Sequence, residues 1–143
     1  MKTVDFPLPD TEWEGTRGFW EAAAREQLAI PRCAACQRFQ WYPRERCRAC
    51  GGELAWTAVS GRGTLFSWAV VRRALVPAFA QKLPLLTALV ALAEDPAVRV
   101  VTNLVDCEPE ALRAELPVRV VFRPLVFPNL ERRVVAPMFT PAP

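Results

Sequence analysis

Four cysteines in two close pairs are the residues of this sequence best suited to chemistry. They are Cys33 and Cys36 and, after ten intervening residues, Cys47 and Cys50. A Cys-x2-Cys turn places two thiolates on one side of a tight knuckle, and two facing knuckles supply four sulfurs to a tetrahedral Zn²⁺ ion. Glycine after Cys50 favours the second knuckle, because glycine adopts positive φ readily. Four protein ligands leave no coordination position for water, so the spacing predicts a structural metal rather than a catalytic one.

Two alternatives to zinc remain open from the spacing alone. Four sulfurs also suit a rubredoxin-type iron centre. The other alternative is four free thiols or two disulfides without any metal, which a reducing cytoplasm disfavours. A cytoplasmic location is the default expectation, because the N-terminus has no secretory signal and no apolar run approaches the roughly 20 residues of a membrane span.

No nucleophile paired with a base is evident in this chain. The sequence contains no histidine, which removes the commonest general base. The fifth cysteine, Cys107, lies between Asp106 and Glu108, whereas a reactive thiol needs a cationic neighbour to lower its pKa. We therefore expect Cys107 to be an ordinary cysteine at the end of a strand, and we assign no catalytic residue.

The remaining sequence predicts a mainly β protein with an N-terminal helix. Helix-forming residues with an aromatic and apolar stripe predict a helix over 17–28, closed by Pro31, after an extended arm over 1–16. Runs rich in β-branched and aromatic residues predict strands, and a proline-led segment predicts a short helix. The predicted strands are 64–72, 85–92, 98–105, 118–122 and 125–127, the short helix is 108–115, and the tail is interrupted by Pro137, Pro141 and Pro143.

Five strands with one short helix among them fit a small closed barrel of the OB type. We therefore expect three parts: an arm and helix over 1–31, a rubredoxin-like zinc ribbon over 32–56, and an OB-fold domain over 57–143. The basic residues in the ribbon loops, Arg32, Arg38, Arg44, Arg46 and Arg48, would partly offset the negative charge of a four-thiolate site.

Longer stretches of the sequence resemble a known family. They are Phe19-Trp20-Glu21-Ala22, the first knuckle with its preceding Leu28-Ala29-Ile30-Pro31-Arg32, Tyr42-Pro43-Arg44, the second knuckle with Gly51, the stretch from Trp56 through Ser60-Gly61-Arg62-Gly63 to Trp68, and Pro137-Met138-Phe139. Together they are similar to the acyl-CoA-associated zinc-ribbon/OB-fold proteins, long catalogued as a domain of unknown function. The resemblance covers roughly residues 17–140.

This resemblance implies a role beside another enzyme. Members of the family accompany thiolase-fold enzymes, including thiolases and steroid side-chain aldolases that act on acyl-CoA thioesters of aromatic, steroid or fatty acyl compounds. It implies a non-catalytic accessory subunit, while the partner supplies the nucleophile and bases. Large aromatic residues are enriched at interfaces, so Phe19, Trp20, Trp41 and Tyr42 are candidate partner-binding residues, together with Trp13. The alternative for Phe19 and Trp20 is that they pack the helix onto the ribbon or barrel.

Two other binding functions are compatible with the sequence. Arg72 and Arg73 follow a predicted strand and could meet the phosphates of acyl-CoA, although a solvated strand end explains them equally simply. A zinc ribbon joined to an OB barrel could also bind single-stranded nucleic acid, with Trp41 and Tyr42 stacking on bases. The net charge of +3, from 18 basic and 15 acidic residues, is small for that role.

Overall fold

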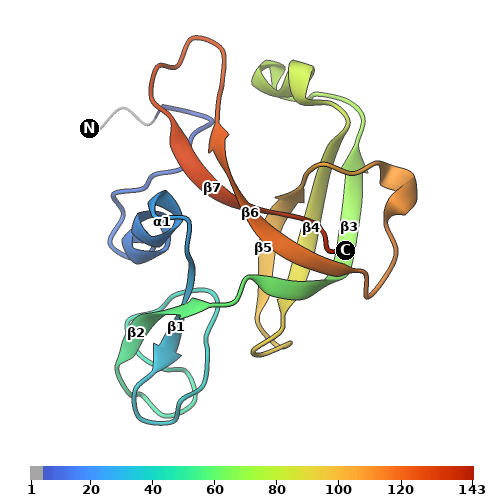
Figure 1. The fold of residues 1–143 in the computed structure, drawn as a ribbon. Helices are drawn as coiled ribbons and strands as arrows, with labels where there is room; N and C mark the ends of the chain where they lie inside the picture. Colours follow the sequence, from blue (N-terminus) through green and yellow to red (C-terminus); the bar gives the residue numbers. More distant parts are fainter. Residues whose placement is uncertain (1–4) are drawn as a thin grey trace.

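The computed structural model describes residues 5–143, which form one helix, a two-stranded ribbon and a closed barrel (Figure 1). Residues 1–4 of the expected arm lie outside the described residues, and residues 5–16 form turns and bends. The helix is α1 (Arg17–Ala24), and the 3-10 turns are η1 (Pro77–Lys82) and η2 (Pro109–Ala111). The strands are β1 (Leu28–Cys33), β2 (Leu54–Val59), β3 (Arg62–Val71), β4 (Leu85–Leu92), β5 (Arg99–Leu104), β6 (Pro117–Leu125) and β7 (Val134–Pro141).

Helix α1 is shorter than the sequence predicts. It ends at Ala24, not at residue 28, because Glu26 adopts a left-handed conformation with φ 57°. The Gln27 N–H then donates to the Ala22 carbonyl at 3.0 Å, and the Glu26 N–H donates to Ala23 at 2.9 Å. These are the two hydrogen bonds of a Schellman motif, in a position where glycine is the usual signal.

Strand β1 begins at Leu28, where the sequence predicts the last residue of a helix. Leu28 and Ile30 are buried, and β1 pairs antiparallel with β2 from Leu28–Val59 to Cys33–Leu54. Pro31 was predicted to end the helix but lies inside β1, opposite Trp56. A proline is tolerated there because a two-stranded ribbon has only edge strands. The structure therefore corrects both the helix end and the role of Pro31.

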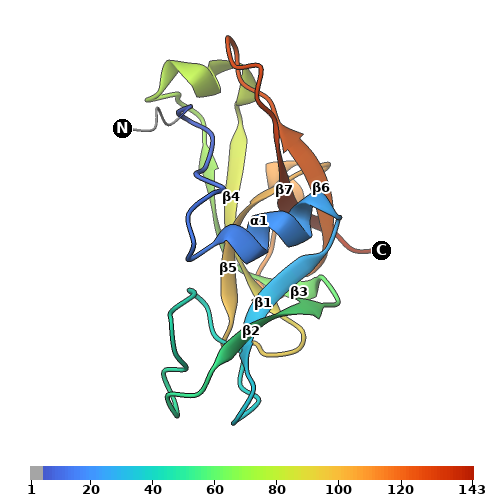
Figure 2. The same ribbon diagram turned by 90° about the vertical axis from the view of Figure 1, so that its left-hand side faces the viewer.

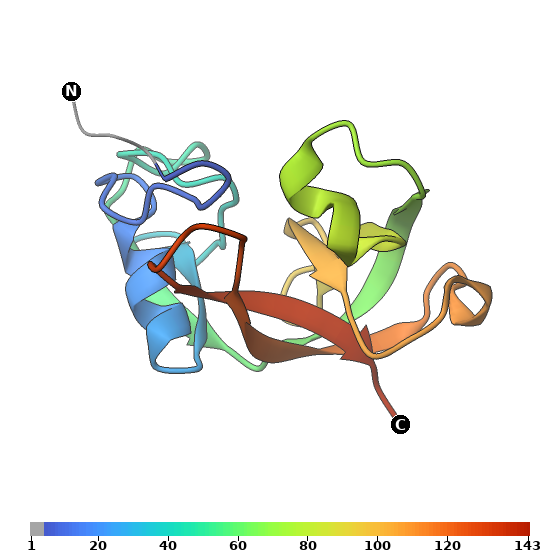
Figure 3. The same ribbon diagram turned by 90° about the horizontal axis from the view of Figure 1, so that it is seen from above.

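The other five strands close into a barrel in the order β3-β4-β5-β7-β6, with β6 returning to β3. This confirms the predicted mainly β fold with an OB-like barrel. Helix α1 contacts both β1 and β7, so it lies between the ribbon and the barrel (Figure 2). Viewed from above, the β6–β7 hairpin reaches from the barrel toward α1 (Figure 3).

The last part of the barrel differs from the prediction. The predicted strand 118–122 is part of the longer β6, which ends at Leu125, so residues 126–127 of the predicted strand 125–127 lie outside any strand. The tail expected to be broken by prolines is the long strand β7. Pro124 pairs with Val135 and Pro137 pairs with Phe122 in the β6–β7 ladder. The predicted helix over 108–115 is reduced to the 3-10 turn η2. Proline was given too much weight as a strand breaker. Where the backbone N–H of a strand residue points away from the neighbouring strand, the ladder does not need that N–H, and proline is tolerated there.

One apolar core joins the ribbon, the helix and the barrel. Leu65, Val90 and Phe139 from the barrel are fully buried, and Ile30 from β1 lies in the same cluster with 0% exposure. Phe19 of α1 belongs to this cluster as well. The ribbon is therefore held against the barrel by shared side-chain packing in addition to the chain connection.

Candidate metal centre

Four cysteine sulfurs meet at the tip of the ribbon. Cys33 is the last residue of β1, and the other three lie in the loops between β1 and β2. Their four Sγ atoms all lie within 4.8 Å of one another. Cys33 and Cys50 are 3.5 Å apart, and Cys36 and Cys47 are 3.7 Å apart. A tetrahedron of thiolates around Zn²⁺ at about 2.3 Å has sulfurs about 3.8 Å apart, so the cluster has the dimensions of a zinc site.

Two backbone turns of the same kind build the knuckles. The Gln37 N–H donates to the Cys33 carbonyl at 3.0 Å, and the Gly51 N–H donates to Cys47 at 2.8 Å. Gln37 has φ 64° and Gly51 has φ 74°, so both residues adopt the left-handed conformation. Gln37 lacks the freedom of glycine, and its side-chain amide donates to the Ala34 carbonyl at 2.9 Å, which supports the turn.

Backbone N–H groups directed at the sulfurs favour thiolates. The Cys36 N–H, at 3.4 Å from the Cys33 sulfur, and the Ala35 N–H lower the pKa of Cys33 to about 6. The N–H groups of Cys50 and Ala49 lower the pKa of Cys47 in the same way. The Gly52 N–H alone would lower the pKa of Cys50, but the neighbouring cysteines raise it to about 11. Forming all four thiolates in so small a volume therefore requires a cation.

The chemistry of this donor set is that of a closed structural site. Thiolate ligands suit Zn²⁺, and four of them fill its tetrahedral shell, which leaves no place for a reacting water. Cys33 and Cys47 are buried, whereas Cys50 is exposed. Gly52 lies so close that an added Cβ would be 2.8 Å from the Cys33 sulfur. The chain thus has a structural zinc centre, with the four cysteines positioned as its ligands.

The arginines around the ribbon make separate contacts. Arg32 stacks over the Phe39 ring at 5.1 Å and donates from Nε to the Gln37 carbonyl at 2.9 Å. Arg46 faces Glu53 at 3.9 Å, with both side chains largely exposed. An exposed pair of this kind contributes little to stability.

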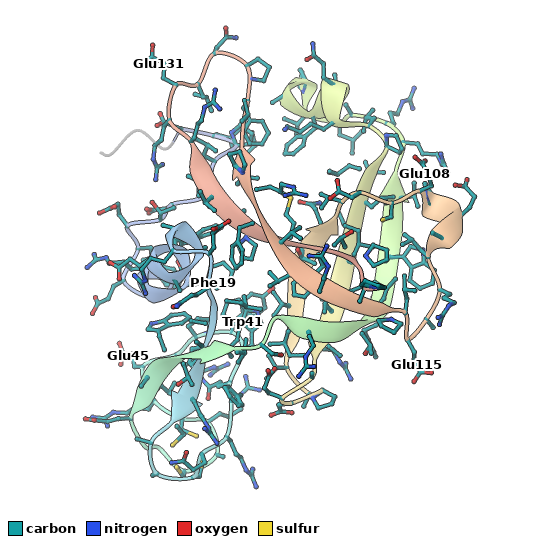
Figure 4. All side chains as sticks on the ribbon, viewed as in Figure 1. Phe19, Trp41, Glu45, Glu108, Glu115 and Glu131 are labelled. Carbon is teal, nitrogen blue, oxygen red and sulfur yellow. The ribbon has the colours of Figure 1, made fainter. Side chains whose placement is uncertain are left out.

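The predicted partner-binding aromatic residues form one continuous array. The rings of Trp20 and Phe19 have centroids 5.0 Å apart, those of Phe19 and Trp41 5.3 Å, and those of Trp41 and Tyr42 5.3 Å. Phe19 and Trp41 point toward each other from α1 and the ribbon loop (Figure 4). Phe19 is only 8% exposed, which fits the packing role considered for it, whereas Tyr42 is 61% exposed. Partner binding by this aromatic array, Trp20, Phe19, Trp41 and Tyr42, stays a prediction.

The other predicted residues lie apart from the array. Arg72 and Arg73 are exposed immediately after β3, and Trp13 is 59% exposed in the turns before α1. Cys107 follows β5 and is partly buried. Burial, together with Asp106 and Glu108, raises the pKa of the Cys107 thiol, which makes it a poor nucleophile at neutral pH.

A groove beside the aromatic array was not predicted from the sequence. It has a volume of about 380 Å³ and lies between the array and the barrel, where Val101, Pro137 and Met138 form its far wall. None of its lining residues is charged. Finding it from the sequence would have required recognising β7, for which the apolar run Val134-Val135-Ala136, followed by Met138-Phe139, was the available signal. The described residues also include no helix long and apolar enough to cross a membrane.

Comparison with known proteins agrees with this architecture. A family model described as the ChsH2 rubredoxin-like zinc ribbon domain matches residues 20–56, and one described as the ChsH2 C-terminal OB-fold domain matches residues 56–123. The chain is 35% identical over 127 residues to a protein of Thermomonospora curvata named probable enoyl-CoA hydratase alpha subunit. That alignment covers 87% of this chain and 37% of the relative, so the chain spans little more than a third of the relative's length.

Two solved structures share the fold. One chain, from a structure described as the Ltp2-ChsH2(DUF35) aldolase, has a TM-score of 0.79 and 30% identity, over 93% of this chain and 98% of that one. A protein with unknown function from the DUF35 family, from Sulfolobus solfataricus, has a TM-score of 0.54 and 10% identity, over 76% of this chain and 78% of that one, which shows the fold alone. The chain therefore belongs to the ChsH2 (DUF35) family, whose members join a rubredoxin-like zinc ribbon to an OB-fold domain.

Proposed function

We propose that this chain is a zinc-stabilised, non-catalytic subunit that associates with a thiolase-fold enzyme acting on an acyl-CoA thioester. One observation carries the proposal. The chain matches nearly the whole length of a chain from the Ltp2-ChsH2(DUF35) aldolase, at 30% identity and a TM-score of 0.79. The name of that aldolase has two components, and the relative from Thermomonospora curvata is named as a subunit of a CoA-thioester enzyme.

The chemistry of the described residues supports this division of work. The metal centre has four protein ligands and no open position, so it holds the ribbon and activates no water. The sequence offers no histidine as a base, and the pKa of Cys107 is raised, not lowered. The bond making or breaking in the acyl-CoA substrate is therefore assigned to the partner.

The aromatic array is the proposed contact with that enzyme. Trp41 and Tyr42 stack with an interplanar angle of 28°, and Tyr42 presents a rigid, largely exposed ring at the edge of the uncharged groove. Rigid aromatic residues provide large contact areas at low entropic cost, and they dominate the energetics of many interfaces. Arg72 and Arg73 remain candidates for direct contact with the phosphates of acyl-CoA.

An enoyl-CoA hydratase is the second candidate partner. The observation that favours it is the name of the relative from Thermomonospora curvata. This chain covers only 37% of that relative, and the second candidate assigns the hydratase active site to the part without a counterpart here. The two candidates therefore differ in which enzyme should bind this chain.

Affinity purification from the native cells at low salt tests both candidates. Recovery of a thiolase-fold chain in near-equal amount, identified by mass, supports the proposal, and recovery of a hydratase favours the second candidate. Tyr42→Ala should weaken the complex at least tenfold, since central aromatic anchors contribute about 2 kcal/mol or more. Leu75→Ala is the matched control, because Leu75 is 90% exposed and makes few contacts. Recovery of nucleic acid alone would instead revive the nucleic-acid function.

A further inference from the structure

Strand β3 changes character halfway along its length. From Arg62 to Leu65 exposed and buried residues alternate, but the next four, Phe66 to Ala69, are all exposed. Successive side chains of a strand point to opposite faces of the sheet, so four exposed residues in a row mean that neither face is covered. Strands β4 and β5 of the same barrel do not contain such a run.

The same half of β3 has a free backbone edge. On one side, β3 pairs with β4 as far as Val71. On the other side, its pairing with β6 spans only Arg62 to Thr64. Leu65 then exchanges two 2.9 Å backbone hydrogen bonds with residues 115 and 116 of the loop before β6. Beyond Leu65, no described residue pairs with the second edge of β3.

Large apolar side chains extend from this edge. Trp68 pairs with the buried Ala88 and so lies on the inner face of the barrel, yet it is 37% exposed. Phe66, at the bulge in the β3–β4 ladder, is 48% exposed, and Arg99 stacks on its ring at 3.8 Å. An aromatic side chain on the inner face of a barrel is ordinarily covered, so its exposure indicates that the barrel leaves room there for another segment.

The segment lacks the usual protection against strand pairing. Edge strands are normally blunted by lysine, proline or inward-pointing charges. Residues 63–71, Gly-Thr-Leu-Phe-Ser-Trp-Ala-Val-Val, contain no proline and no charge, and they are rich in β-branched and aromatic residues. An unprotected edge of this composition pairs readily with an extended chain. A partner strand that covers the edge would explain why the folded protein keeps it without proline or charge.

The charges that flank the edge indicate which occupant fits. Arg62 precedes the neutral segment, Arg72 and Arg73 follow it, and residues 62–73 contain no carboxylate. Neither Arg72 nor Arg73 forms an ion pair among the described residues. Pairing β3 with β3 of a second copy would bring only arginines and no carboxylate to the ends of the new ladder, which is unfavourable. A strand with acidic residues at its ends matches this edge.

We propose that the free edge of β3, Phe66–Val71, receives an extended β-strand with acidic flanks from the enzyme subunit that this chain accompanies. The identity of the donor rests on the proposed function. The incoming strand adds backbone hydrogen bonds to the barrel, covers Phe66 and Trp68, and places carboxylates near Arg72 and Arg73. The neutral strand supplies most of the affinity, and the arginines select the acidic flanks.

A designed peptide tests the edge directly. The probe is a fluorescein-labelled peptide of alternating valine and threonine with two aspartates at each end, and its binding is followed by fluorescence anisotropy. It should bind at least tenfold more tightly than the same peptide with lysine ends. A third peptide, methylated on alternate backbone nitrogens of its pairing edge, should not bind, because it cannot form the ladder. Equal binding of all three peptides, or of none, would overturn the proposal.

Protein variants provide the second arm of the test. Trp68→Lys places a charge at the free edge and should weaken peptide binding at least tenfold, and Phe66→Ser serves if the first variant fails to fold, as judged by the loss of a cooperative unfolding transition in urea. Val126→Lys is the matched control, because it adds the same charge at an apolar side chain that is 40% exposed elsewhere. Weakening by the control as much as by Trp68→Lys would contradict edge pairing, as would a dimer of this chain that Trp68→Lys dissociates.

The same variants separate this proposal from the proposed function. If the enzyme copurifies with wild type and with Val126→Lys but not with Trp68→Lys, the edge is part of that interface. If the enzyme copurifies equally with all three, the proposed function stands and the edge proposal is wrong. If no thiolase-fold enzyme or hydratase is captured although the acidic peptide binds, the edge pairs strands as inferred but the proposed function fails.

Discussion

Replacing Gly52 by alanine should damage the zinc centre through steric contact alone. Gly52 has no positive φ that would make a side chain intrinsically unfavourable. An added Cβ would nevertheless lie 2.8 Å from the Cys33 sulfur, 3.0 Å from the Ala35 Cβ and 3.3 Å from the Cys50 sulfur. Two of the three obstructing atoms are metal ligands, so relieving the contact moves the ligands themselves.

The size of the effect follows from these distances. The shortest contact falls about 0.6 Å short of the 3.4 Å at which ordinary van der Waals contact begins. Metal–ligand distances tolerate only about 0.2 Å of change. Overpacking of this kind costs about 1–3 kcal/mol, and each 1.4 kcal/mol is a factor of ten in affinity. Gly52→Ala should therefore weaken zinc binding by about 5- to 140-fold.

Gly51→Ala is the matched control, because it adds the same methyl group at the adjacent residue. An added Cβ at Gly51 meets nothing within 4 Å, but φ is +74°. Its cost is the conformational strain of a left-handed alanine, about 1–2 kcal/mol, which lowers stability and leaves the ligand geometry intact. Zinc affinity is measured by competition with a chromophoric chelator, and geometry by the ligand-field spectrum of the Co²⁺-substituted protein.

The two variants should thus differ in kind. Gly52→Ala should alter the Co²⁺ spectrum, whereas Gly51→Ala should lower the free energy of unfolding with a wild-type spectrum. A Gly52→Ala protein with a wild-type spectrum and a zinc affinity within twofold of wild type would refute the steric reasoning.

Three further perturbations test other parts of the structure. Cys47→Ser should give zinc-free, aggregation-prone protein, because metal binding is folding free energy in such ribbons, and a folded variant with full zinc content by elemental analysis would refute this. Phe139→Ala should lower the free energy of unfolding in urea by about 3–5 kcal/mol, since Phe139 is 0% exposed, and a loss below about 1 kcal/mol would contradict the central place of β7. Glu94 accepts a 2.7 Å hydrogen bond from the Ser60 N–H; partial burial alone would raise the pKa of Glu94, but the hydroxyl and N–H of Ser60 lower it below its ordinary value. Because the pKa of Glu94 is lower in the folded state, its carboxylate stabilises the fold above the unfolded pKa of about 4.3, and this stabilisation is lost as pH falls through the folded value. Glu94→Gln should therefore lower the free energy of unfolding at pH 7 and match wild type in acid. A difference in stability that stayed constant with pH would exclude this linkage.

The metal centre was the most predictable part of the molecule, because its information is local. Cys-x2-Cys spacing dictates a knuckle whatever surrounds it, and the four sulfurs meet as the sequence indicates. The strands β3, β4 and β5 were also predicted closely, since each has a run of β-branched and aromatic residues. The first knuckle shows the limit of the rule: Gln37 takes the conformation expected of glycine and is supported by its own side-chain hydrogen bond.

The errors fell where tertiary structure overrides local preference. Nothing in residues 25–28 predicts a helix end, yet Glu26 adopts a left-handed conformation, and Leu28 and Ile30 are buried as strand residues of the ribbon. Strand β7 was not predicted because Pro137 was taken to interrupt it. Pro137 nevertheless pairs with Phe122 in the ladder, at a position that does not require an N–H donor. The groove and the free edge of β3 depend on which strands lie next to each other in the barrel, and the sequence pattern does not give that strand order.

The zinc ion connects to the proposed interface through the ribbon. Its ligands fix the end of β1 and the loop that carries Trp41 and Tyr42, five residues or more before Cys47. Trp41 packs on Phe19, and Phe19 lies in the core that Ile30 shares with the barrel. Releasing the metal removes the constraint on one side of the aromatic array, whereas Leu65, Val90 and Phe139 of the shared core lie on barrel strands that the metal does not hold. Zinc therefore supports the proposed interface more than the barrel, so its removal should abolish the proposed partner binding by the aromatic array before it unfolds the strands.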